Sequence, residues 1–284
     1  MPSSIRRESS PGDEESLRYH FVQMTSSLIG IDLNAPIHRI FQSRRLLPDL
    51  LAKRLTLVRP DCWDDPFEYF IKKCTFEYPD ENSQFVSHQF GRSPNVFAQC
   101  WSVGTESDAM WRMYSNVTKN GLGVNTDVDA EGIKVCTTPK KLLSAIVPGL
   151  EATGYKVFVG LVQYETDSTI HEWFADEILR NGLNAFNDIK VHAESLLQKR
   201  LPFIHEAEAR LICIGDQGAN GDRTLVAAIE AEQIFGEIIL DPRITAADVK
   251  MRTNQLRETG FIGTISQSQL YQDMELEVCA FNNG

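Results

Sequence analysis

The chain has 284 residues, of which 42% are hydrophobic and 24% are charged, as is typical of a soluble globular protein. Its formal net charge of -11 argues against broad attraction to nucleic-acid phosphates, although a local groove with a few contacts stays open. Six dispersed cysteines without metal-binding spacing predict a reduced, cytoplasmic protein with no disulfide framework. Because no apolar run approaches the ~20 residues that span a bilayer, no membrane association is expected.

The N-terminal third predicts an extension followed by alternating strands and helices. Residues 1–35 are expected to form the extension, with a disordered first part and a helix over 16–31. Alternation over 36–41 predicts a strand, helical spacing predicts a helix over 46–53, and 55–58 is expected to be a second strand. Asp65, Pro66 and Glu68 have the order of a helix cap, a first-turn proline and a capping box, which predicts a helix over 65–72.

The remainder predicts one α+β domain over residues 36–284, with a mixed sheet and flanking helices. Helices are expected from 107 or 108 through Tyr114, over 139–150, over 171–199 with a break near Gly182, and over 245–258, where Thr245 caps the start and Gly260 marks the end. Strands are expected at 96–102, 121–126, 155–164, 208–214, 224–229, 234–240 and 261–265. The glycine-rich stretch 215–221 is expected to be a hairpin loop.

Three short segments place residues that are costly to bury unless paired beside apolar residues. They cover 64–68, 110–114 and 205–210. Helix capping explains the first better than function does, and core packing explains the second better than a stacking platform. In the third, Glu206, Glu208 and Arg210 enter an apolar strand and require partners. A structural ion-pair network and a ligand site explain this group equally well.

Taken in order with 37–39, 100–102 and 238–243, these segments resemble a mainly bacterial family catalogued as domain of unknown function 2971. The resemblance covers roughly residues 36 to 270. No chemistry is established for this family, so the resemblance supports the limits of the domain more than it supports an activity.

The chain order of Arg39, Ser102 and a Glu-Ala-Glu run ending at Glu208 is similar to the arginine, serine and glutamate pattern of ADP-ribosyltransferases, which transfer ADP-ribose from NAD. The resemblance implies an ADP-ribosyltransferase-like fold with NAD as substrate. It also implies that Arg39 or His38 grips the ribose or a phosphate, and that Ser102 positions the nicotinamide side. Glu208 would stabilise the positive charge that develops as the glycosidic bond opens.

The same resemblance implies that Glu206 acts as a base on a protein or nucleic-acid acceptor. If residues 206–208 are extended, Glu206 and Glu208 face the same side of the strand. The hydroxyl of Tyr114 is expected to reach the same pocket. The pattern departs from the family at Trp101 and Val103, which flank Ser102 where a serine-threonine-serine run is usual.

The leading hypothesis is an NAD-using ADP-ribosyltransferase-like enzyme, acting as a bacterial toxin or defence effector, with Glu208 and Glu206 as catalytic residues and no metal. The rival is a noncatalytic sensor or partner-binding domain in which the same polar cluster holds a ligand or only the fold. A third hypothesis is a metal-dependent nucleic-acid-processing enzyme that uses Asp65, Glu68, Glu206 and Glu208.

Overall fold

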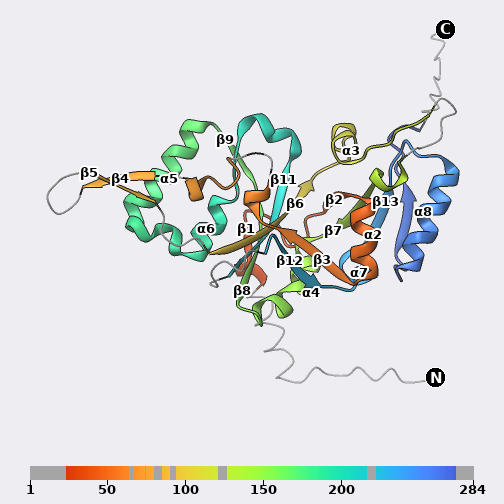
Figure 1. The fold of residues 1–284 in the computed structure, drawn as a ribbon, viewed down its shortest axis with the longest axis horizontal. Coiled ribbons are helices and arrows are strands. Elements are labelled where there is room, and N and C mark those ends of the chain that lie inside the picture. Colours follow the sequence, from red (N-terminus) through yellow and green to blue (C-terminus); the bar gives the residue numbers. More distant parts are fainter. Residues whose placement is uncertain are drawn as a thin grey trace, which may run out of the picture.

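The computed structural model describes residues 24–63, 65, 67–73, 75–79, 85–89, 94–120, 127–215 and 222–272. Within them the architecture is α+β, with a large mixed sheet and flanking helices, so the predicted fold class is confirmed at that level (Figure 1). Among these residues, no helix has the length and apolar character needed to cross a membrane.

Most of the predicted strands are present, because alternating or wholly apolar runs set them apart. The strands at 28–29, 75–79, 85–89, 132–137 and 198–200 were not predicted. In chain order they are β1 (Leu28–Ile29), β2 (Ile37–Gln42), β3 (Arg54–Val58), β4 (Thr75–Pro79), β5 (Phe85–Gln89), β6 (Asn95–Val103), β7 (Gly132–Thr137), β8 (Tyr155–Leu161), β9 (Gln163–Glu165), β10 (Gln198–Arg200), β11 (Glu208–Gly215), β12 (Thr224–Ala228), β13 (Glu237–Leu240) and β14 (Thr264–Gln267). The strand predicted at 121–126 and most of the loop predicted at 215–221 lie outside the described residues.

The main sheet runs β1-β8-β11-β6-β2-β7-β13-β14, with β3 and β12 attached beside β6. Its central pairs are antiparallel, whereas β1–β8 and β13–β14 are parallel. Strand β6 changes partner along its length: its end pairs with β2 through Ser102 and Val103, and its middle pairs with β3 at Ala98. Residues 28–29 belong to this sheet, so it takes in part of the predicted extension.

The helices are α2 (Ser43–Leu51), α3 (Asp108–Tyr114), α4 (Pro139–Glu151), α5 (Asp167–Asn181), α6 (Ile189–Ser195), α7 (Ala231–Ile234) and α8 (Ala246–Glu258). Short 3-10 turns are η1 (Pro60–Cys62), η2 (Phe70–Lys73), η3 (Val128–Ala130), η4 (Gly182–Asn187) and η5 (Leu201–Glu206). The predicted capping box of Thr245 and Asp248 is present at the start of α8.

Three predicted helices were wrong in whole or in part. Of the helix expected over 16–31, residues 24–26 are helical, 28–29 form β1, and 16–23 lie outside the described residues. In place of the helix expected over 65–72, residues 67–69 form a turn followed by the 3-10 turn η2; Asp65 does accept from the backbone amide of Phe67 at 2.9 Å, but no α-helix is present among the described residues of this range. The helix expected over 171–199 divides into α5, η4, α6 and strand β10. Gly182 ends α5 with φ +67, a left-handed conformation that favours glycine, and Asp188 then caps α6 by accepting from two backbone amides.

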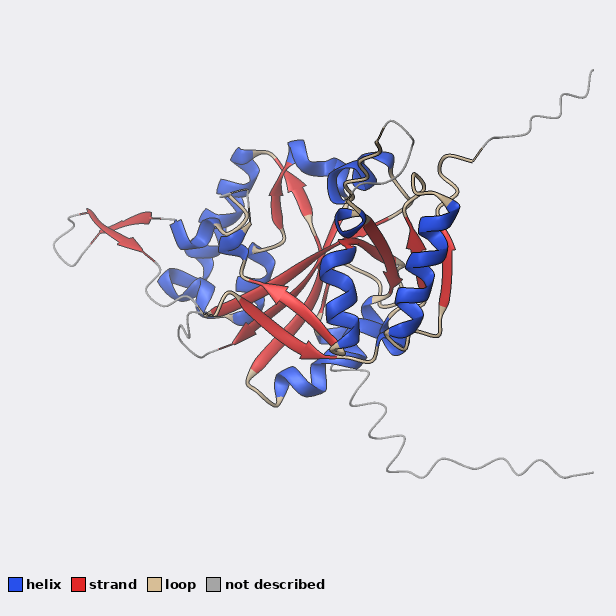
Figure 2. Cartoon of the chain, turned by 45° about the vertical axis from the view of Figure 1, so that its right-hand side comes forward, coloured by secondary structure: helices blue, strands red, loops and turns tan. Residues whose placement is uncertain are grey.

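Helices cover both faces of the sheet, and the two faces differ in how much of the sheet is packed against apolar residues (Figure 2). On one face, α2, α4, α7 and α8 enclose the largest apolar core together with alternate residues of the central strands. On the other face, α6 packs over β8, β11 and β6, and α3 packs over β2 and β13. The stretch of sheet between these two apolar clusters carries polar residues.

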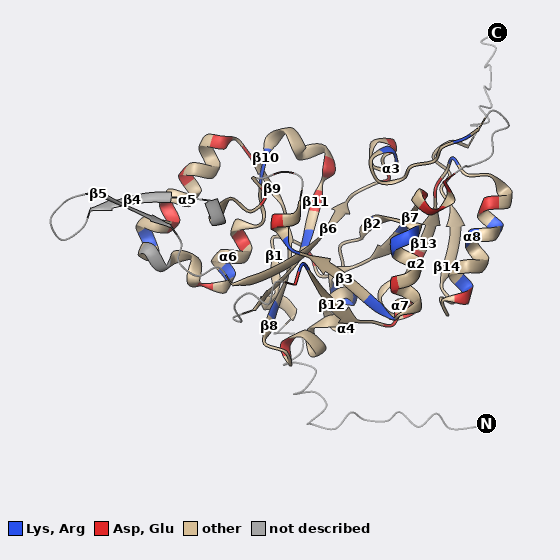
Figure 3. Cartoon of the chain, in the orientation of Figure 1, with Lys and Arg blue, Asp and Glu red and all other residues tan. Residues whose placement is uncertain are grey.

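The charges on the outer helices are of both signs. Figure 3 shows acidic and basic residues side by side along α8, and mostly acidic residues along α5. Neither helix presents an unbroken basic surface of the kind that holds nucleic-acid phosphates.

Candidate functional site

Three of the residues singled out from the sequence lie in one row across adjacent strands. Strand register pairs His38 of β2 with Ser102 of β6, and Ser102 with Glu208 of β11. Directly paired residues of antiparallel strands share a face, and neighbouring strands lie ~4.8 Å apart. The three side chains therefore emerge on the same face within about two strand spacings, although 170 residues separate the first from the last in sequence.

The His38 and Ser102 side chains are nearly buried, at 7% and 6% exposure. Within the described part of the chain neither side chain takes part in a hydrogen bond. Burial, reinforced by the positive charge of Lys134, lowers the pKa of His38 to about 4, so its imidazole is neutral near pH 7. A neutral imidazole and a hydroxyl each donate and accept hydrogen bonds. Because neither side chain has a partner among the described residues, the pair can offer a donor and an acceptor to uncharged polar groups of a ligand.

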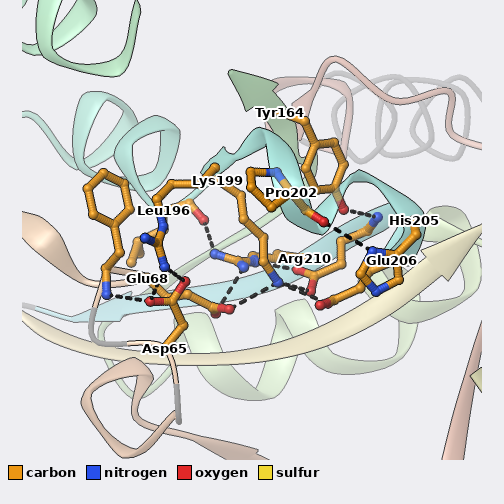
Figure 4. A network of polar contacts seen from close by, with 12 residues as sticks. Asp65, Glu68, Tyr164, Leu196, Lys199, Pro202, His205, Glu206 and Arg210 are labelled. Atoms are coloured by element: carbon orange, nitrogen blue, oxygen red, sulfur yellow. Dashed lines mark hydrogen bonds and ion pairs between the residues drawn. The ribbon is translucent and has the colours of Figure 1, made fainter. Parts of the chain in front are cut away.

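Next to the row, one lysine holds three carboxylates (Figure 4). The Nζ atom of Lys199, the middle residue of β10, lies 3.0 Å from Glu68, 2.9 Å from Glu206 and 2.7 Å from Glu208. Its side chain is only 3% exposed. Burial alone would lower the pKa of Lys199, but the three carboxylates outweigh burial and raise it, so the ammonium stays charged.

A buried arginine completes the cluster from the same strand as Glu208. Arg210 donates from Nε to Glu208 at 2.8 Å, from Nη2 to Glu68 at 2.9 Å and from Nη1 to the carbonyl oxygen of Leu196 at 2.7 Å. Its guanidinium also lies 4.8 Å from the ring centroid of Trp63. Both oxygens of Glu68 and both oxygens of Glu208 therefore meet a cation, as a buried ion pair requires.

The backbone between the two glutamates is not extended, which corrects the expectation that they alternate along one strand. Glu206 ends η5, Ala207 is left-handed with φ 45 and ψ 56, and Glu208 begins β11. The turn is held because the carbonyl oxygen of Ala207 accepts from the amide of Val103 at 2.7 Å. A left-handed alanine costs about 1–2 kcal/mol, and here it brings both carboxylates to Lys199.

The surroundings of the two glutamates shift their pKa values in opposite directions. Burial and the neighbouring Glu208 carboxylate raise the pKa of Glu206 to about 7. Burial also acts to raise the pKa of Glu208, but the charges of Arg210 and Lys199 outweigh it and hold that pKa well below its usual range. Near neutral pH, Glu208 is thus a fixed anion, whereas Glu206 exchanges a proton.

We expect the Glu206→Gln substitution to change how stability depends on pH. The pKa of Glu206 is 4.5 in its ordinary state and about 7 in the fold, so the native state keeps a proton that the unfolded chain loses in this range. Wild-type stability should therefore fall as pH rises through that window, and the variant should gain stability relative to wild type between about pH 5 and pH 8. Urea denaturation at both pH values measures this; the exposed Glu172→Gln variant is the control. An equal change in both variants would contradict the shift.

The other two predicted binding residues lie near the row on different elements. One Arg39 guanidinium nitrogen donates to the carbonyl oxygen of Cys100, and its Nε is buried without a partner among the described residues. Tyr114 is 38% exposed at the end of α3, close enough to Arg39 and Glu206 for their charges to act on it. By contrast, Met110 and Trp111 are buried in the core, as predicted.

Sequence reasoning missed Lys199 and misassigned Glu68. The sequence pattern predicts Lys199 at the end of a helix and Glu68 as a helix-capping residue. Tyr164 was also missed: its hydroxyl oxygen accepts from the backbone amide of Glu208 at 2.8 Å. The available signal was the need of three charged residues in an apolar strand for partners of opposite charge.

The carboxylates named for a metal centre are arranged around protein cations. Glu68, Glu206 and Glu208 do converge, but the ammonium of Lys199 lies at their centre. Asp65 is paired with Arg200, with both its oxygens at 3.1 Å. Across the described ranges, no group of three or more histidine, cysteine, aspartate or glutamate side chains is arranged to hold a metal ion.

Comparisons with protein-family models, with curated proteins and with solved structures return no significant match to this chain. The resemblances to domain of unknown function 2971 and to ADP-ribosyltransferases therefore stay predictions.

Proposed function

We propose that the chain is an ADP-ribosyltransferase-like enzyme that cleaves the nicotinamide glycosidic bond of NAD. The observation that carries the proposal is the row of His38, Ser102 and Glu208, in which two nearly buried polar side chains have no partner among the described residues. Ribose hydroxyls and a carboxamide are the uncharged polar groups that such a pair can hold.

Glu208 supplies the fixed negative charge that the reaction needs. Lys199 and Arg210 keep it ionised and immobile, so no reorganisation is required when positive charge develops on the ribose. When all groups are ionised, the cluster has a net charge of -1, because it contains three carboxylates and the two cations Lys199 and Arg210.

Glu206 is the proton-transferring group in this proposal. Its pKa of about 7 lies where a general base is most effective at neutral pH. Its side chain is 13% exposed, more than that of Glu208 at 5%, and it can therefore meet an acceptor nucleophile from solution.

The test is nicotinamide release from NAD by purified wild-type protein and by Ser102→Ala. Loss of one neutral hydrogen bond to the substrate should raise KM about three- to tenfold with a smaller change in kcat. Ser144→Ala, at an exposed serine of α4, is the matched control. Absence of release by wild type, with or without cell extract as acceptor source, would refute the proposal.

One observation favours the rival function, a noncatalytic binding domain. Both oxygens of Glu68 and of Glu208 are already paired, so the cluster is complete as a structural network. In that case wild-type protein would bind NAD or another polar ligand through His38 and Ser102 without releasing nicotinamide, and Glu208→Gln would leave binding intact.

A further inference from the structure

A separate pocket lies behind the short β9–β10 ladder. Its volume is about 210 Å³, and its wall mixes aliphatic, aromatic, amide and carboxyl groups. The lining residues are Ile29, Leu161, Gln163, Trp173, Glu194, Leu197 and Gln198. The volume is below the ~300 Å³ at which sites for drug-sized ligands begin, so the pocket suits one ring system.

Two carboxamides lie side by side in this wall, because the parallel register pairs Gln198 with Gln163. Among the described residues, the side chain of Gln163 donates only to the carbonyl oxygen of Leu161 at 3.2 Å, and that of Gln198 only to the carbonyl oxygen of Glu194 at 3.4 Å. Neither carboxamide oxygen accepts a hydrogen bond from the part of the chain that the structure describes. Both oxygens are thus open to a donor on a ligand.

The remaining walls favour a flat ring over a charged or extended ligand. Trp173 contributes an indole, and Leu161 and Leu197 contribute apolar surface. Glu194 adds a half-buried carboxyl group, with Lys190 3.9 Å away. A phosphate group would meet that carboxyl, whereas an exocyclic amine would donate to it.

We infer that this pocket binds a heteroaromatic base bearing an amino group, of the aminopurine or aminopyrimidine class. The ring stacks on Trp173, its amine donates to Glu194 or to a carboxamide oxygen, and its ring nitrogens accept from a carboxamide. Nothing in this inference depends on the activity proposed above.

The same ladder connects the pocket with the charged cluster. The residues that follow Gln163 and Gln198 are Tyr164 and Lys199, which are paired with each other. Tyr164 accepts from the amide of Glu208, and Lys199 holds the three carboxylates. Successive strand residues point to opposite faces, so a base seated against the carboxamides bears on the backbone that presents Lys199. We therefore expect ligand binding in the pocket to shift the position of Lys199 relative to the three carboxylates.

The experiment is calorimetric titration of the full chain with adenine and with unsubstituted purine. Adenine should bind saturably, about five- to tenfold more tightly than purine, because purine lacks the amine. Gln163→Leu should weaken adenine binding about five- to tenfold, while Gln233→Leu, at another exposed glutamine, should not change it. In hydrogen exchange at an adenine concentration near the wild-type Kd, adenine should slow exchange across residues 196–206 in wild type and Gln233→Leu, and less in Gln163→Leu.

Three results would overturn the inference. Absence of saturable adenine binding at millimolar concentration would show that the pocket is not a site for this class of base. Equal affinities of the Gln163→Leu and Gln233→Leu variants would place adenine elsewhere, and equal affinities for adenine and purine would reject the amino-base class. Unchanged exchange across 196–206 on saturation would remove the regulatory connection.

Discussion

Replacement of Lys199 by methionine is expected to lower the free energy of unfolding by about 3–5 kcal/mol at neutral pH. The methionine fills similar volume but leaves Glu68, Glu206 and Glu208 converging without their shared cation. Only Arg210 then remains to compensate two of them. The loss should shrink as pH falls toward 4, because Glu206, whose pKa is raised to about 7, is then protonated and no longer repels its neighbours. Urea denaturation across this pH range measures both effects.

The matched control is Lys190→Met on α6. Lys190 lies 3.9 Å from Glu194 and is 62% exposed, and exposed pairs of this kind contribute ~0–1 kcal/mol. A Lys199→Met variant no less stable than Lys190→Met would show that the cluster does not depend on the lysine. A loss of stability that does not vary with pH would point to packing as its cause.

Replacement of Glu208 by glutamine is expected to reduce nicotinamide release about 10²–10³-fold, the usual cost of removing one electrostatic group from an enzyme site. The amide still accepts hydrogen bonds but carries no charge to stabilise the developing positive charge on the ribose. Initial rates at saturating NAD, with circular dichroism spectra of both proteins, measure the effect separately from unfolding.

Glu68→Gln separates catalysis from structural charge pairing. Glu68 meets the same Lys199 and Arg210 as Glu208, at 3.0 and 2.9 Å against 2.7 and 2.8 Å, but it lies outside the row of His38 and Ser102. The two variants should lose similar stability, whereas Glu68→Gln should keep release within roughly tenfold of wild type. Equal rates in the two variants would contradict the role proposed for Glu208.

The sequence was informative wherever a local pattern decides the structure. The alternation of β2, the apolar run of β11 and the capping box at Thr245 each reflect a period or a hydrogen bond within a few residues. These features depend on neighbours in the chain, so no tertiary information was needed to find them.

The candidate site depended on contacts that no local pattern encodes. Lys199 contacts Glu68, which lies 131 positions earlier in the chain. The sequence around Lys199 favours a helix, but pairing with β9 makes residues 198–200 a strand. The left-handed Ala207 could not be foreseen, because alanine rarely adopts that conformation and is held there by an amide of β6. The row itself follows from the register of three strands that are far apart in sequence.

The order of strands in the main sheet also constrains how the protein is made. Strand β11 lies between β8 and β6, yet more than 100 residues separate it from the end of β6. At ~5–20 residues per second, the ribosome takes roughly 5–20 s to synthesise that interval. Throughout it the edge of β6 that pairs with β11 is open, and β8, made within the interval, lacks the same partner for the rest of it. A nascent chain that stalls before residue 208 therefore lacks the strand that joins β8 to β6, and the exposed strand edges favour aggregation. We expect folding to be slow, because strands far apart in sequence must pair before the core forms.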